Sequence, residues 1–124
     1  MTIRSDGKVS IGVPDNELLG NYKLYVKEGI ITERCRVAFR NTSDWADYVF
    51  AKDYCLMPIN DLEDFIKENK HLPDVPSADD VVKQGLDVAQ TDAMLLKKIE
   101  ELHLYIIQMK NELDALKAEK TKQQ

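Results

Sequence analysis

The chain has 124 residues, of which 44% are hydrophobic and 31% charged, proportions typical of one soluble folded domain and not of a disordered chain. Its formal net charge of −5 argues against the basic face with which nucleic-acid binders displace counterions from phosphates. No apolar stretch approaches the roughly 20 residues that span a bilayer, and the first residues lack the apolar run of a secretory signal. We therefore expect a soluble module that neither binds nucleic acid nor inserts into a membrane.

Short strands separated by turns are predicted for residues 1–57, which we assign as a β-rich region. Ser5-Asp6-Gly7 separates residues 2–4 from residues 8–11, and Asp-Gly readily adopts the positive φ angles of a tight turn. A hairpin is therefore expected here. Residues 22–26 alternate in character and precede a turn at residues 27–29, which predicts a second strand pair.

Residues 31–39 show the two-residue period of a strand with one buried face, and Cys35 falls on the inner side. This strand would pair with residues 22–26. The aromatic and β-branched run at residues 45–50 fits either a further strand or a packed corner. Two cysteines, Cys35 and Cys55, are too few for a disulfide framework, so we expect reduced, buried thiols, with a single bridge as the open alternative.

Residues 58–86 are predicted to form a connector of two short helices. Asn60 is placed to cap the first helix and Glu63 to complete a reciprocal capping box, while the segment 71–73 (His-Leu-Pro) ends it. Three apolar side chains share one side of this helix: Leu62, Phe65 and Ile66.

The second short helix is marked by Ser77 and Asp80, and Gly85 is suited to close it because glycine tolerates a positive φ.

The last and longest helix is predicted to open at Asp87, with Gln90 three residues further on, and to reach at least Lys117. We assign residues 87–119 to this helix and expect the polar tail, residues 120–124, to fray.

A heptad repeat runs through this last helix without a break. Its apolar residues are spaced alternately four and three apart, which places each of them at position a or d of a coiled coil. In a parallel arrangement Glu112, at position g, faces Lys117, at position e of the neighbouring chain. We call the apolar set the seam, and it consists of Leu95, Ile99, Leu102, Ile106, Met109, Leu113 and Leu116.

The alternative to self-association is that the seam packs against the first half of the same chain. Burying these side chains would contribute roughly 10–20 kcal/mol as an upper limit, yet the short strands and helices have little apolar face to offer in return. Isoleucine at a with leucine at d favours a dimer. A wider apolar band (Leu96, Leu104, Tyr105 and Ile107) favours a trimer or a second surface that holds the helix of Leu62, so the oligomer number stays open.

Few residues indicate chemistry. His71 and His103 have no further ligands at metal-binding spacing, so we expect no metal and no cofactor. Trp45 begins an aromatic run that would suit sugar stacking, although core packing is the simpler use. Three arginines on one face of the predicted strand would suit an anionic glycan or phosphate, although a solvated outer face is the better explanation: Arg34, Arg36 and Arg40.

Several segments resemble the C-terminal modules of tail-fibre-like proteins in Bacteroidetes and their phages. The most specific parts are the tryptophan segment and the His-Leu-Pro segment. The resemblance covers nearly the whole chain, and it is found in residues 20–26 (GNYKLYV), 29–33 (GIITE), 44–50 (DWADYVF), 53–54 (DY), 65–73 (FIKENKHLP) and 95–102 (LLKKIEEL).

This resemblance implies a module at the end of a fibre or adhesin-like protein, trimeric, with interwoven strands that lead into a C-terminal helical bundle. It also implies a virion tail or appendage assembled in the bacterial cytoplasm, other virion or appendage proteins as partners, and a host-surface glycan as a candidate ligand. The module is similar in placement to endosialidase-type intramolecular chaperone domains, some of which cut themselves at a serine. Ser43 is the only candidate for such a cut, but residues 45–47 depart from the Arg/Lys-rich continuation of those domains.

The sequence therefore predicts an α+β structural module that associates with copies of itself through a parallel coiled coil, and not an enzyme. The alternatives are a receptor- or glycan-binding fibre tip and a chaperone that cleaves itself at Ser43. Whether a longer protein carries the module is not fixed by the sequence.

Overall fold

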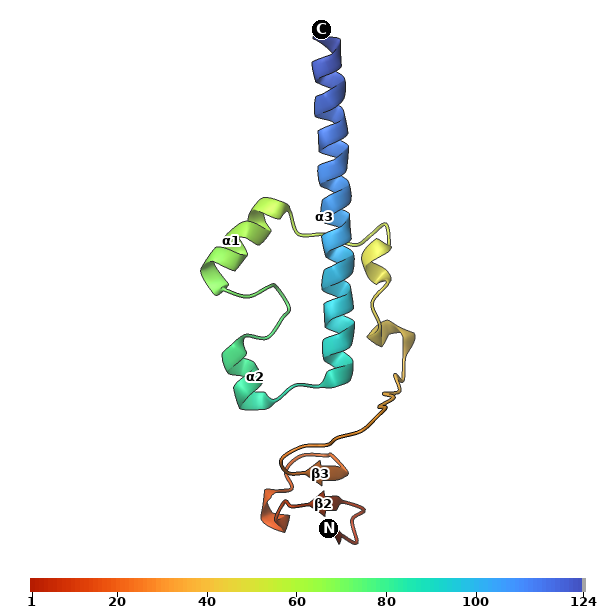
Figure 1. Ribbon diagram of the computed structural model, residues 1–124, viewed down its shortest axis with the longest axis vertical. Helices are drawn as coiled ribbons and strands as arrows, with labels where there is room; N and C mark the ends of the chain where they lie inside the picture. Colours follow the sequence, from red (N-terminus) through yellow and green to blue (C-terminus); the bar gives the residue numbers. More distant parts are fainter. Residues whose placement is uncertain (124) are drawn as a thin grey trace. The chain divides into compact units, whose positions relative to one another are not determined.

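The computed structural model describes residues 1–123 and confirms the α+β class. The chain divides into two compact units, one of Met1–Arg36 and one that begins at Val37. The described part of the first unit contains a three-stranded sheet, and that of the second contains three α-helices, of which the last is long (Figure 1).

The predicted hairpin opens the first unit. Strand β1 (Thr2–Ile3) pairs antiparallel with β2 (Val9–Ile11), and Ile3 lies opposite Val9. Gly7 adopts a φ of 81° in the turn, where its N–H donates to the Arg4 carbonyl over 3.1 Å. Because glycine lacks a Cβ, it adopts this φ at little cost.

The third strand corrects the predicted second strand pair. Strand β3 (Leu24–Val26) runs parallel to β2, so it extends the first sheet and is not a partner for residues 31–39. The connection from β2 to β3 passes through the 3-10 helix η1 (Asp15–Glu17). Lys8 holds this connection, because its Nζ donates a hydrogen bond to the Leu18 carbonyl over 3.0 Å. A parallel pair requires such a crossover connection, which sequence alternation does not reveal.

Residues 31–39 form no strand, so this prediction is wrong. Glu28 and Gly29 adopt φ angles of 76° and 143° just before this segment, and they direct the backbone away from the extended path of β3. A strand also needs a neighbour for its backbone N–H and C=O groups, and the segment has none among the described residues. The expected burial of the thiols is wrong as well, because Cys35 and Cys55 are both exposed.

In the second unit, residues 45–50 form a packed corner and not a strand. They lie around the 3-10 helices η2 (Thr42–Asp44) and η3 (Tyr48–Phe50). Val49 is 1% exposed, and Ala46 is also buried. This corner is the largest part of the small core of the unit.

Helix α1 (Ile59–Asn69) begins one residue earlier than its predicted cap. Pro58 occupies the capping position, and no side chain caps the first turn, so the capping box predicted for Asn60 and Glu63 is wrong. Proline has no side-chain oxygen that could accept a hydrogen bond from the first turn, so it cannot supply such a cap. The helix ends before the His-Leu-Pro segment, as predicted, with Lys70 in the left-handed conformation.

Helix α2 (Ala78–Gln84) has the predicted capping box. Ser77 Oγ accepts from the Asp80 N–H over 3.2 Å, and Asp80 Oδ2 accepts from the Ser77 N–H over 3.3 Å. Gly85 closes the helix with a φ of 76°, as expected. These contacts span only three residues, which is why the sequence predicted them.

Helix α3 (Val88–Lys122) opens as predicted, with Asp87 Oδ1 accepting from the Gln90 N–H over 2.9 Å. It continues to Lys122, so the expected fraying is wrong for residues 120–122, while Gln124 lies outside the described residues. Helices α1 and α2 lie along one side of α3, and the η3 segment lies along another (Figure 1).

Two buried side chains of α3 hold the packed corner. Glu100 Oε2 accepts from the Asp47 N–H over 3.2 Å, and Tyr105 donates its hydroxyl to the Met57 carbonyl over 2.6 Å. Glu100 and Tyr105 are 6% and 7% exposed. They therefore fix which face of α3 is covered by its own chain.

Replacing Tyr105 by phenylalanine should lower the free energy of unfolding by about 1 kcal/mol, because the ring stays buried while one hydrogen bond is lost. Urea unfolding followed by circular dichroism measures this difference. Tyr48→Phe is the matched control, since no hydrogen bond of the Tyr48 hydroxyl is found among residues 1–123 and little change is expected. Equal losses in both variants would contradict the assigned role of Tyr105.

Candidate functional site

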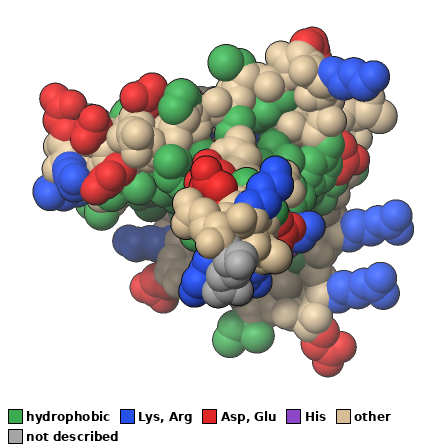
Figure 2. Space-filling model, turned by 90° about the horizontal axis from the view of Figure 1, so that it is seen from above, with side chains coloured by type: hydrophobic (Ala, Val, Ile, Leu, Met, Phe, Trp, Pro, Cys, Tyr) green, Lys and Arg blue, Asp and Glu red, His purple; other side chains and the backbone are tan. Residues whose placement is uncertain are grey.

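The seam of α3 is uncovered in the single chain. All seven seam residues are between 49% and 62% exposed, from Leu95 at 49% to Met109 and Leu116 at 62%. Figure 2, which views the molecule from above, shows hydrophobic side chains interspersed with charged ones. An apolar row this long on a soluble chain is the kind of surface that marks an interaction site.

The C-terminal half of α3 has no covering segment at all. Every residue from 106 to 123 is exposed, and this part of the helix extends past α1 (Figure 1). An isolated helix of this length is only marginally stable in water, because most helical stability in proteins comes from packing of an apolar face. The seam is the face through which such packing would occur.

The chain's own buried contacts on α3 are made outside the seam, at positions b, f and g. Counting Ile99 as position a, the buried Glu100 is at b and the buried Tyr105 at g, and the half-buried Leu104 is at f. The wide apolar band of the sequence therefore includes a second surface, but the segment that it holds differs from the expected helix of Leu62. This surface holds the η3 segment and Met57, whereas Ile107 stays 52% exposed.

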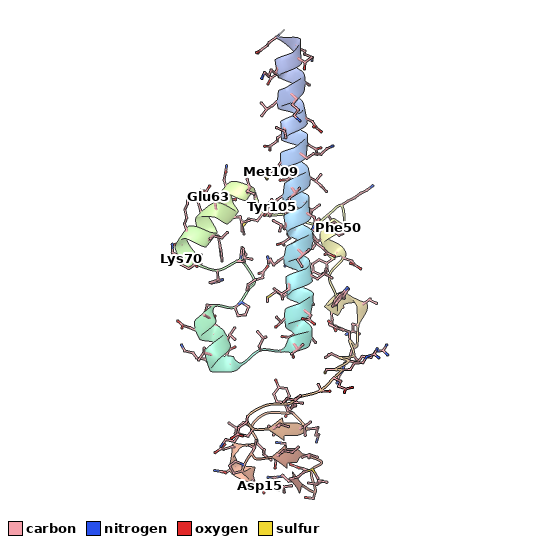
Figure 3. All side chains as sticks on the ribbon, in the orientation of Figure 1. Asp15, Phe50, Glu63, Lys70, Tyr105 and Met109 are labelled. Carbon is pink, nitrogen blue, oxygen red and sulfur yellow. The ribbon has the colours of Figure 1, made fainter. Side chains whose placement is uncertain are left out.

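An open groove of about 430 Å³ separates α1 from α3. Figure 3 shows α1 running from Glu63, level with Tyr105, to Lys70, with its side chains beside but not closed onto α3. The α1 side contributes Leu62, and the His-Leu-Pro segment contributes Leu72. The α3 side of the groove contains three of the seven seam residues, namely Leu95, Ile99 and Leu102.

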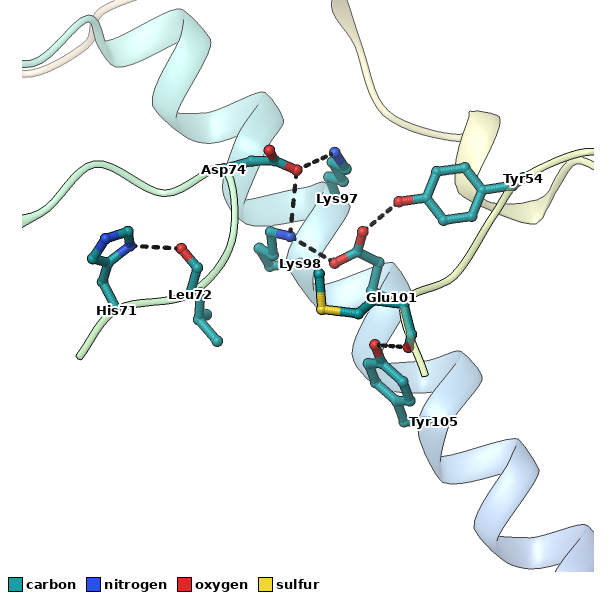
Figure 4. Close-up of polar contacts among 9 residues, drawn as sticks. Tyr54, His71, Leu72, Asp74, Lys97, Lys98, Glu101 and Tyr105 are labelled. Carbon is teal, nitrogen blue, oxygen red and sulfur yellow. Dashed lines mark hydrogen bonds and ion pairs between the residues drawn. The ribbon is translucent and has the colours of Figure 1, made fainter. Parts of the chain in front are cut away.

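A network of charged and phenolic groups joins the loop after α1 to α3 (Figure 4). Asp74 Oδ2 lies 3.0 Å from Lys97 Nζ and 3.9 Å from Lys98 Nζ. Lys98 Nζ lies 2.8 Å from Glu101 Oε2, and Glu101 also accepts a hydrogen bond from the Tyr54 hydroxyl. The network fixes the loop and residue 54 against one flank of α3.

The protonation equilibria of this network follow from its contacts. The hydrogen bond and the positive charge of Lys97 lower the pKa of Asp74. Burial opposes the charged form of Lys97, but the bond to Asp74 outweighs it and raises the pKa of the ammonium. Burial, followed by the bond to Glu101 and its negative charge, raises the pKa of Tyr54. Both members of the Asp74–Lys97 pair thus stay charged and Tyr54 stays protonated at neutral pH, as a structural clamp requires.

The predicted inter-chain pair, Glu112 and Lys117, lies in the exposed half of α3. No ion pair of either residue is found within the described part of the chain, whereas neighbouring Lys110 pairs with Asp114 over 3.2 Å. Both charges are therefore available for a contact with another copy.

The predicted arginine face does not exist as a strand face, because residues 31–39 are irregular. Arg34 and Arg36 belong to the first unit and Arg40 to the second, and all three are exposed. Arg40 lines a hollow of about 760 Å³ with Phe39 and Lys97.

Other sequence-predicted groups lie apart from the seam. Trp45 is 40% exposed, and its ring contacts Phe39 edge to face at 5.3 Å. The two rings therefore pack against each other and do not form a flat platform for a sugar. Ser43 is exposed in η2. His71 contacts Phe65 edge to face at 5.6 Å, and His103 contacts the Ile99 carbonyl through Nδ1 at 2.7 Å.

Within residues 1–123, no group of three or more histidine, cysteine, aspartate or glutamate side chains is arranged to hold a metal ion. No helix of this part of the chain combines the length and apolar character needed to cross a membrane.

Comparisons with protein-family models, curated proteins and solved structures find no match to this chain. The functional argument therefore rests on the seam, the groove and the network that positions them.

Glu100 should make stability depend on pH. Its burial raises the pKa of the carboxyl, partly offset by the hydrogen bond from the Asp47 N–H. The folded state therefore binds the proton more tightly than the unfolded state, and the cost of the buried charge is removed as the pH falls through the raised pKa.

The melting temperature of the natural chain, measured relative to Glu100→Gln, should accordingly rise between pH 7 and pH 4, since the variant cannot titrate at this position. Calorimetry at several pH values checks this. A temperature difference that stays constant with pH would show that Glu100 is not perturbed.

Proposed function

We propose that this chain is a structural module that associates with copies of itself, and that the seam of α3 is the surface of association. The observation that supports the proposal most is the exposure of all seven seam residues, each of which is 49% exposed or more in the single chain. Residues at every a and d position match the spacing of a parallel coiled coil.

Magnitudes favour this function over a solitary chain. About half of each seam side chain is still exposed, so covering the seven would contribute roughly 5–10 kcal/mol per chain as an upper limit. The second unit has a small core of its own, with Ala46, Val49 and Tyr105 as its buried hydrophobic side chains among the described residues. Association would therefore supply a large share of the stability of α3.

The assembly that we propose is a trimer at the end of a tail-fibre-like appendage of a phage or bacterium, with other appendage proteins as neighbours. The sequence resemblance supports this setting. Two exposed apolar residues, Ile31 of the first unit at 105% exposure and Val37 of the second at 44%, would be covered by the interwoven strands that the resemblance implies.

Charge placed in the seam tests the proposal. Ile106→Asp should dissociate the oligomer at micromolar concentration, because a carboxylate buried among apolar side chains costs several kcal/mol. Light scattering measures the mass, and circular dichroism should show loss of helix in the C-terminal half of α3.

Ile107→Asp is the matched control. Ile107 is 52% exposed and Ile106 is 54% exposed, but Ile107 lies at position b, outside the seam. The control variant should form an oligomer of the same mass as the natural protein. A natural chain that is monomeric at micromolar concentration would reject the proposed function.

A charge exchange tests the parallel orientation. Glu112→Lys should destabilise the oligomer by roughly 0.5 kcal/mol per contact, because it places a lysine opposite Lys117 of the neighbour. Adding Lys117→Glu should restore the stability, which thermal melting at low salt measures. Failure of the second change to compensate would contradict a parallel arrangement.

A further inference from the structure

The groove between α1 and α3 lies on one particular flank of the seam. With Ile99 at position a, the α3 side chains that line the groove include Lys98 and Tyr105 at g and Leu95 and Leu102 at d. Position e lies on the other flank, where Leu96 is half-buried and His103 is exposed. The arm formed by α1 and the His-Leu-Pro segment thus accompanies the g flank alone.

This asymmetry determines which side chains of a second, parallel α3 helix would face the groove. In a parallel coiled coil the g flank of one helix faces the e flank of the next. At the level of the groove, the e flank of the neighbour carries Leu96 and His103. We propose that the groove between α1 and α3 holds the e flank of α3 from a second copy of this chain, with Leu62 against His103 and Leu72 against Leu96 of that copy. The inference rests on the proposed function and adds the arm to the interface.

Three observations support a second copy as the occupant. The groove is continuous with the seam, since Leu95, Ile99 and Leu102 line it. Its outer wall is apolar and incompletely covered, because Leu72 is 40% exposed and Leu62 is half-buried. The polar network holds the loop of Asp74 to Lys97, which keeps the arm on the g flank and prevents it from folding across the seam.

Charge is also complementary. The Tyr105–Met57 hydrogen bond places the start of α1 level with Tyr105 (Figure 3). The first two turns of α1 carry Asp61, Glu63 and Asp64, whereas the e flank of α3 carries His103 and Lys110 near this level. A neighbouring copy would therefore bring Lys110, whose pair with Asp114 of its own chain is exposed, towards this acidic helix start. The acidic groups there are also favoured by the helix dipole.

Disulfide trapping tests the inference. In a chain whose native cysteines are replaced (Cys35→Ser and Cys55→Ser), one protein carries Leu62→Cys and a second, of different tagged mass, carries His103→Cys. The two are unfolded together, refolded as mixed oligomers and oxidised. We expect a covalent heterodimer on non-reducing gels, at least tenfold more abundant than with the control partner Ile107→Cys, which lies one turn away at position b.

Light scattering on the same samples separates the two proposals. A stable oligomer that forms neither the Leu62–His103 crosslink nor that of the second pair described below would overturn the arm contact while leaving the seam intact. A monomer would overturn both. A chain carrying both cysteines that forms the bond only within itself would also overturn the inference, because the arm would then cover its own seam.

A second pair, Leu72→Cys with Leu96→Cys, repeats the test one turn towards the start of α3. Circular dichroism of each variant before oxidation should show the helix content of the natural chain. The expected crosslink in either correctly folded pair supports the inference, and its absence in both rejects it.

Discussion

The uncovered apolar seam of α3 is the constraint on which the rest of the second unit depends. A row of seven side chains, each about half exposed, cannot remain in water without a large free-energy cost. The chain's own segments leave this row about half exposed, because the η3 corner contacts Glu100 at position b and Met57 contacts Tyr105 at position g, both outside the seam. The proposed self-association would cover the seam without requiring any other protein.

The polar contacts have a positioning role in this scheme. Glu100 and Tyr105 hold the corner of residues 46–57, while Asp74 pairs with Lys97 and Lys98 to hold the loop after α1. Each pair is worth little by itself at a partly exposed site. Together they orient the covered face of α3, and so they decide that positions a, d and e remain open while g carries the arm.

The same arrangement explains why the groove is not a conventional ligand pocket. One wall comes from Leu62 and the His-Leu-Pro segment, and the other comes from α3 and includes the seam residues Leu95, Ile99 and Leu102. A small molecule bound there would leave most of the seam exposed. In the proposed assembly, a helix from a second copy would cover the groove and the seam with one surface, and in cyclic order each arm would cover the next copy.

Local interactions determined what the sequence alone predicted correctly. The turn at Gly7, the capping box of Ser77 with Asp80, the start of α3 at Asp87 and the heptad spacing each involve residues a few positions apart, so their chemistry is visible in the order of amino acids. Only the tertiary structure decided that β3 runs parallel to β2, that residues 31–39 form no strand, and that Cys35 and Cys55 are exposed. It also decided that a groove separates α1 from α3. These features depend on which distant segment supplies a backbone partner or covers an apolar face, and alternation or composition within one segment carries no information about that partner.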